Sequence, residues 1–185
     1  FKKFQFYPKY YVAVNEKILR QSSKQINALN SVKFLSNRTP ELFTENALTY
    51  ILNTEKPKER FSKLIHNGIE EGWTVTYAAL QIAYYMGFSR VIIVGMDHRF
   101  EYQGSPNEAK ILHGEDPNHF CGNYFGGGQA WDNPDLGHSE ESYSIARTIY
   151  EQDGREILDA TVGGACNIFK KTTLDAVFSA NGMCK

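Results

Sequence analysis

Residues 72–98, GWTVTYAALQIAYYMGFSRVIIVGMDH, constrain the fold more strongly than any other segment. Thr74 is a residue type that caps helices, and after it apolar side chains recur at the spacing of one buried helical face until Gly87. Residues 91–94 then form an unbroken β-branched run, which is typical of a parallel strand covered on both faces. The segment predicts a helix followed by a central strand of an α/β sheet.

The polar residues that follow this predicted strand are the first candidates for chemistry. In open α/β sheets, ligands bind beyond the carboxyl ends of the strands, and this end carries Asp97 and His98. Asp97 has two interpretations. It holds a magnesium ion together with the phosphates of a nucleotide, or it only caps backbone amides at the strand end. We expect a ligand site here and leave the role of Asp97 open.

Length, composition and charge narrow the class of protein. The 185 residues, 42% of them hydrophobic, suit one compact domain over residues 1–185, and no apolar run is long enough to cross a membrane. A formal net charge of −1 argues against a nucleic-acid partner, because tracking phosphates needs a basic face. The three cysteines form no CxxC pair, which favours reduced thiols and a cytoplasmic location and argues against a structural zinc site.

Strand and helix patterns alternate along the rest of the chain. Between residues 36 and 68 the pattern is weak, and a Lys/Glu-rich run there predicts a solvated surface loop. The further elements that we expect are strands at 10–14, 32–35 and 157–158, and helices at 16–29, 139–152 and 172–178. This alternation predicts a three-layer α/β fold with a mostly parallel sheet.

A long segment of about forty residues, roughly 98–137, follows the predicted central strand. Loops of this length are uncommon in compact domains unless they cover a ligand or build its site. Its chemistry-bearing residues, with those at its borders, are Asp97, His98, Arg99, His113, Asp116, His119, Tyr124, Trp131 and His138. The histidine spacing matches no metal-binding motif, and glycines 126–128 match no phosphate-binding loop. We expect a lid whose aromatic rings stack on a base, a pterin or a sugar, or simply pack the loop.

His138 has the strongest claim to catalysis. It precedes Ser139, which together with Ser142 and neighbouring acids predicts the start of a helix capped by a hydroxyl. The dipole at a helix N-terminus disfavours an imidazolium, so the ring stays neutral and able to take a proton from an attacking hydroxyl. The alternative is a histidine of the capping region that has no part in catalysis.

Two segments, residues 72–98 and 136–158, resemble the bacterial CMP-sialic acid-dependent sialyltransferases. The shared pattern is a Thr-led helix, a strand that ends in Gly-x-Asp at Asp97, a variable lid, and Gly-His-Ser at His138 before a helix and a strand. This resemblance implies a modified Rossmann-type sheet with a lid. In that family the histidine of this motif is the proposed base, so the same role is implied for His138.

The same segments look even more like the wider 6-hydroxymethylpterin diphosphokinase-like family. That family includes motility accessory factors that modify flagellin and proteins of surface-polysaccharide loci. The likeness extends to YYVAVNEKI at residues 10–18 and to ATVGGACNIF at residues 160–169, so it covers most of the chain. The two families are related, so the resemblance implies the Rossmann-like fold more firmly than it implies one reaction.

The resemblance implies three alternative functions. The first is a sialyltransferase-like glycosyltransferase that moves a sugar from a CMP-activated donor to a glycan hydroxyl, with the donor held by Thr74 and Thr76 and its charge neutralised by Arg99. This reaction requires no metal. The second is an ATP-dependent diphosphokinase, which needs Mg²⁺ on Asp97. The third is a non-catalytic domain that binds a nucleotide or a sugar.

Two features depart from the family pattern. The expected first strand and its glycine/asparagine-rich nucleotide loop have no match in FKKFQFYPKYY, so we expect that this strand is missing. Arg99 and Asp135 stand where the family places tyrosines around the donor phosphate, and Tyr102 and Tyr124 are the substitutes nearest to them. We expect a cytoplasmic protein and leave open both peripheral association with the inner membrane and homo-oligomerisation.

Overall fold

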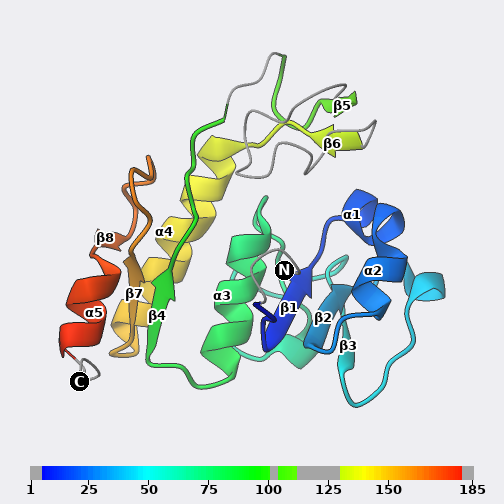
Figure 1. Ribbon diagram of the computed structural model, residues 1–185, viewed down its shortest axis with the longest axis horizontal. Coiled ribbons are helices and arrows are strands. Elements are labelled where there is room, and N and C mark those ends of the chain that lie inside the picture. Colours follow the sequence, from blue (N-terminus) through cyan, green and yellow to red (C-terminus); the bar gives the residue numbers. More distant parts are fainter. Residues whose placement is uncertain (1–5, 101–103, 112–129, 181–185) are drawn as a thin grey trace. The chain divides into compact units, whose positions relative to one another are not determined.

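The computed structural model describes residues 6–100, 104–111 and 130–180. The chain divides into two compact units, Phe1–Tyr85 and Met86–Lys185. Figure 1 traces it from the blue amino-terminal strands to the red carboxyl-terminal helix. Each unit has a three-stranded parallel sheet, which confirms an α/β fold. The expectation of one domain over residues 1–185 stays a prediction.

The sheet of the first unit has the order β1-β2-β3, with all strands parallel. Its strands are β1 (Tyr10–Ala13), β2 (Val32–Ser36) and β3 (Thr49–Leu52). The first two were predicted, whereas β3 lies inside the weakly patterned stretch at residues 36–68, where we expected no strand. A strand of four residues is too short to show a clear period, and Tyr50 on this strand is exposed.

The predicted helix at residues 16–29 is two short helices, α1 (Glu16–Gln21) and α2 (Ser23–Asn27). The carboxamide of Asn15 accepts a hydrogen bond from the Ile18 N–H at 3.1 Å and so caps α1. The interruption falls at Ser22, a residue type that favours helix ends over helix interiors. Both helices contribute to one apolar core, whose buried members are Ala13, Leu19, Ile26, Leu35 and Phe43.

The long helix of the first unit, α3 (Val75–Tyr85), confirms the expectation for this segment. The Thr74 hydroxyl accepts a hydrogen bond from the Thr76 N–H at 3.3 Å, and Gly87 follows the helix in the left-handed region with φ +84°. The side chain of Gln81 is fully buried. Its Oε1 accepts a hydrogen bond from the Ser62 N–H at 2.9 Å, and its Nε2 donates a hydrogen bond to the Glu70 carbonyl at 2.7 Å. The segment before α3 is therefore tied to this helix, although its sequence shows little pattern.

The second unit has the sheet order β4-β7-β8, again all parallel. Its strands are β4 (Arg90–Ile93), β7 (Glu156–Asp159) and β8 (Lys170–Lys171). Among the described strands β7 is central and β4 lies at an edge, with Val94 just beyond it 57% exposed. The prediction that residues 91–94 form a fully covered central strand is therefore not met, because a β-branched run indicates a strand but does not fix its place in the sheet.

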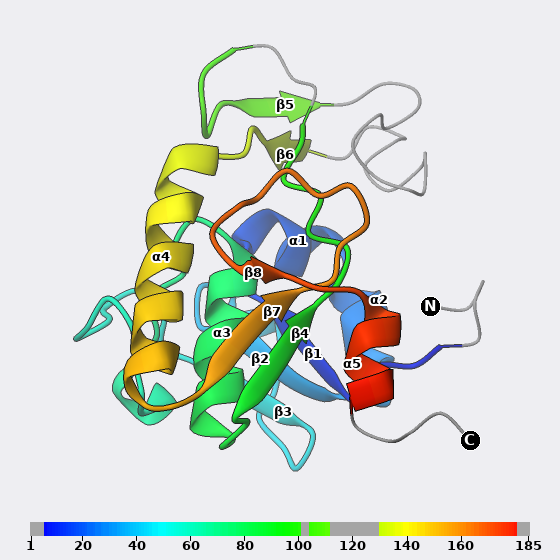
Figure 2. The same cartoon turned by 90° about the vertical axis from the view of Figure 1, so that its left-hand side faces the viewer.

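Helix α4 (Leu136–Gln152) lies along β7, and α5 (Leu174–Ala180) follows β8 (Figure 2). Between β4 and α4 the strands β5 (Ala109–Ile111) and β6 (Ala130–Asp132) pair in antiparallel fashion. Part of the segment that we expected to be a lid therefore has regular structure. The remaining lid candidates, His113, Asp116, His119, Tyr124 and glycines 126–128, lie outside the described residues. No helix in the described part of the chain is long and apolar enough to span a membrane.

Candidate functional site

The loop after β4 is held to the loop after β7 at the carboxyl ends of these two strands. The Met96 N–H donates to the Thr161 hydroxyl at 3.0 Å, and the Ala165 N–H donates to the Asp97 carbonyl at 2.8 Å. A side chain at Gly164 would approach the Met96 carbonyl to 3.0 Å, so the two loops meet closely. This edge of the sheet is where the sequence predicts a ligand, and its backbone is fixed by these contacts.

Asp159, the last residue of β7, anchors the same edge. Its carboxylate is fully buried and accepts hydrogen bonds from the Lys171 ammonium at 2.6 Å and the Thr161 N–H at 2.8 Å. Burial opposes ionisation, but the bonds from Lys171 and Thr161 outweigh it and lower the pKa of Asp159. Sequence reasoning missed this pair, because an acid at a strand end and a lysine twelve residues later carry no recognisable motif.

His138 and Asp135 form a close pair at the start of α4. Asp135 is the N-cap: its Oδ1 accepts the His138 N–H at 3.1 Å, and its Oδ2 lies 2.8 Å from His138 Nδ1. An ionised carboxylate only accepts hydrogen bonds, so Nδ1 carries the hydrogen. The helix therefore begins before Ser139, which we expected to cap it; the Ser139 hydroxyl instead donates to the Asp135 carbonyl at 2.7 Å.

The exposure and charge of the pair suit proton transfer. The imidazole of His138 is 52% exposed, whereas the carboxylate of Asp135 is only 12% exposed. The hydrogen bond from His138 is the largest cause of a lowered pKa of Asp135, and a further bond comes from the Asn107 amide at 3.3 Å. The negative charge of Asp135 lies beside the ring and acts against the helix dipole on which our expectation for His138 relied. With Nδ1 bound, Nε2 is the nitrogen positioned to exchange a proton.

His98 is packed rather than presented to solvent. Its side chain is 6% exposed, its Nε2 lies 3.0 Å from Oε1 of Glu140 on α4, and its ring centroid is 5.9 Å from that of Tyr143. Its backbone has φ +51°, which is uncommon for a residue other than glycine. His98 thus joins the loop after β4 to α4, and the contact with substrate that we expect of it stays a prediction.

The remaining predicted residues are distributed over both units. Asp97 and Arg99 are exposed beyond β4, and the Arg99 guanidinium donates to the Gly163 carbonyl at 3.3 Å. Thr74 and Thr76 belong to the first unit, at the start of α3. Tyr124 lies outside the described residues. Among the described residues, no group of three or more His, Cys, Asp or Glu side chains could hold a metal ion, so a magnesium role for Asp97 stays a prediction.

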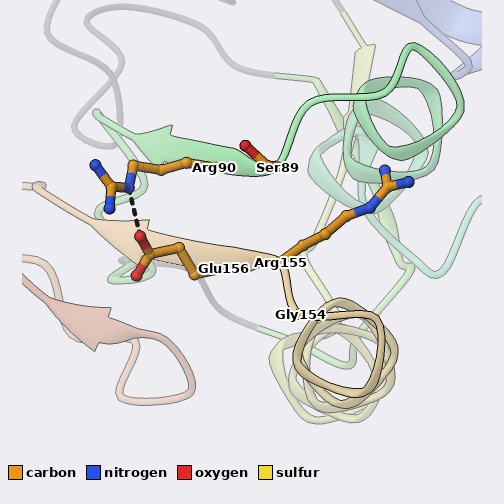
Figure 3. A pocket seen from close by; sticks show the side chains of 5 residues that line it. All are labelled: Ser89, Arg90, Gly154, Arg155 and Glu156. Atoms are coloured by element: carbon orange, nitrogen blue, oxygen red, sulfur yellow. Dashed lines mark hydrogen bonds and ion pairs between the residues drawn. The ribbon is translucent and has the colours of Figure 1, made fainter.

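The two ends of the strands in the second unit differ in chemistry. A hollow at the amino ends of β4 and β7 is lined by Ser89, Arg90, Gly154, Arg155 and Glu156 (Figure 3). Arg90 is paired with Glu156, and the heads of Arg90 and Arg155 point away from each other. These two positive charges do not converge on one ligand. The candidate residues Asp97, His98 and Arg99 follow the opposite, carboxyl end of β4.

No family model, curated protein or solved structure matches the chain.

Proposed function

We propose that this chain is a sialyltransferase-like glycosyltransferase domain that transfers a sugar from a CMP-activated donor to a glycan hydroxyl. The observation that supports this most is the pairing of His138 with Asp135 at the start of α4. A half-exposed imidazole whose other nitrogen is held by a nearly buried carboxylate has the properties of a general base. The Gly-His-Ser pattern of the sialyltransferases falls on this same histidine.

The proposed step moves one proton and one glycosyl group. Nε2 of His138 removes the proton of the acceptor hydroxyl while its oxygen forms a bond to the anomeric carbon of the donor sugar. The bond from that carbon to the phosphate oxygen breaks, and its electron pair leaves with CMP. Asp135 holds Nδ1–H and stabilises the imidazolium that forms. The proton then passes to solvent, because the imidazole is half exposed.

We assign donor binding to the residues that the sequence pattern selected. Thr74 and Thr76 at the start of α3 would bind the donor with their hydroxyls, and the helix N-terminus favours an anionic group. Arg99, which is exposed at the end of β4, would neutralise phosphate or carboxylate charge. Asp97, His98 and Tyr124 complete the proposed binding set.

We also propose that the α/β fold is a three-layer Rossmann-like sheet, and the parallel strand pairing in both units supports this. We further propose a cytoplasmic location.

A thermal-shift titration tests this function against its alternatives. CMP, CTP, ATP and GTP are each added with and without Mg²⁺, because a ligand that binds only the folded state raises the melting temperature. The proposal predicts a shift with CMP that does not need the metal. A shift with ATP that requires Mg²⁺ would replace it by the diphosphokinase, for which exposed Asp97 is the candidate metal ligand. If no nucleotide caused a shift, the remaining alternative would be a domain whose nucleotide site is decayed or incomplete.

A further inference from the structure

A polar network closes the carboxyl end of the first unit's sheet. Ser36 ends β2 and Thr54 follows β3, and because these strands are parallel both residues reach the same edge. Their hydroxyls are 2.7 Å apart and both side chains are buried. The Ser36 hydroxyl also accepts the Arg38 N–H at 3.2 Å. An edge of this kind is where open α/β sheets receive ligands.

Glu71 joins this network from the turn before α3. Its Oε1 accepts a hydrogen bond from Arg38 Nε at 3.0 Å, and its side chain is 22% exposed. Burial raises the pKa of Glu71, although hydrogen bonds from Thr54 and Arg38 act in the opposite direction. The backbone carbonyl of Glu71 accepts a hydrogen bond from the Thr74 N–H at 3.1 Å. Glu71 therefore lies directly before the donor-binding residues proposed at the start of α3. We call Ser36, Arg38, Thr54 and Glu71 the strand-end network.

The strand-end network and the neighbouring Thr39 could form further hydrogen bonds. A carboxylate offers about four acceptor sites, and the hydrogen bonds described for the Glu71 carboxylate come from two side chains, Arg38 and Thr54. Thr39, in the loop after β2, is fully buried, and its hydroxyl has no hydrogen-bond partner among the described residues. Native proteins rarely leave such a group unsatisfied without a reason. Acceptors and hydroxyls at a strand end suit a ligand that supplies hydroxyl donors.

We propose that Glu71 and the hydroxyls of the strand-end network bind the ribose hydroxyls of the nucleotide donor. The Glu71 carboxylate, which Arg38 and Thr54 hold beside the strand ends, matches a ribose diol, because a carboxylate accepts hydrogen bonds from both hydroxyls. The phosphate of the same nucleotide is then directed to the N-terminus of α3, which has eleven residues and begins shortly after Glu71. This inference rests on the proposed function, because it requires a nucleotide substrate.

The test compares CMP with 2′-deoxy-CMP by calorimetric titration. A hydrogen bond from a ribose hydroxyl to a charged group predicts that the wild-type protein binds CMP about tenfold or more tightly than the deoxy nucleotide. Glu71→Gln keeps the shape and removes the charge, so the preference should fall to less than about threefold. Glu59→Gln, at an exposed glutamate of the same unit, is the matched control and should keep the preference. Thr54→Val is a second variant and should also reduce it.

The outcomes separate this inference from the proposed function. A folded Glu71→Gln protein that keeps the full preference for CMP would overturn it, as would a wild-type protein that binds both nucleotides equally. Failure of the wild-type protein to bind any nucleotide would reject the proposed function and the inference together. His138→Ala should leave the preference unchanged, because His138 acts on the acceptor hydroxyl.

Discussion

Asp135 performs two separable tasks, and substitutions can distinguish them. Its Oδ1 caps α4 by accepting the His138 N–H, and its Oδ2 holds His138 Nδ1. Asparagine caps helices as well as aspartate does, so Asp135→Asn keeps the cap. The asparagine amide, however, would donate a hydrogen bond to Nδ1 and so place the imidazole hydrogen on Nε2. The proposed base requires an unprotonated Nε2.

The two tasks differ in the size and kind of their effects. A hydrogen bond to a charged group contributes about 1.5–3 kcal/mol, so loss of the carboxylate in Asp135→Asn should slow transfer by roughly 10- to 100-fold while the melting temperature stays near that of the wild type. Asp135→Ala should lose a similar amount of activity and also the cap, which contributes about 1 kcal/mol. For a chain of this length that corresponds to a decrease in melting temperature of about 2–4 °C.

Three measurements check this prediction: transfer rates, thermal melting, and ¹⁵N NMR of the His138 imidazole. The spectrum should show hydrogen on Nδ1 in the wild-type protein and on Nε2 in Asp135→Asn. In a double variant with His138→Ala, Asp135→Asn should cause no further loss of activity. Wild-type activity in Asp135→Asn would refute the reasoning, and an unchanged tautomer would show that the carboxylate does not set the state of the ring.

Two further predictions concern stability. Gln81→Leu should lower the free energy of unfolding by about 2–4 kcal/mol in urea titrations, because buried Gln81 satisfies main-chain groups at Ser62 and Glu70 that leucine would leave unpaired; an unchanged urea midpoint would contradict this. Lys171→Met should cost about 2 kcal/mol at pH 7, because buried Asp159 would lose its partner. The pKa of Asp159 is lowered by folding, so its contribution is present above its unfolded pKa of about 4 and is lost as the pH falls through the folded value. The cost of Lys171→Met should therefore shrink below about pH 4, and a cost that is the same at pH 3 and pH 7 would argue against this account.

The sequence predicted the elements with strong periodicity and failed where patterns were short. Helix α3 was found because its apolar residues follow one helical period along the segment, and strand β4 because residues 91–94 form an unbroken β-branched run. Strand β3 has only four residues, and the break between α1 and α2 falls at Ser22, within an otherwise helical pattern. The place of β4 in its sheet depends on pairing with β7, which no local pattern encodes.

The candidate site was predicted in part. His138 was found from its position before a helix, but its partner Asp135 was missed because Ser139 was taken as the cap. The signal was present, since an aspartate followed by the apolar Leu136 is itself a helix start. Glu140 beside His98, and Glu71 beside Arg38, join elements that are distant in sequence. Such contacts are set by tertiary packing.

The most direct test of the account is transfer itself. The protein is incubated with a CMP-activated nine-carbon acidic sugar and a panel of glycan acceptors, and the release of CMP and formation of the new glycosidic bond are measured together. We predict transfer by the wild-type protein and by His66→Ala, whose histidine is an exposed residue of the first unit, and a loss of about 100-fold or more in His138→Ala. Equal transfer by folded His138→Ala and the wild type would contradict the central claim.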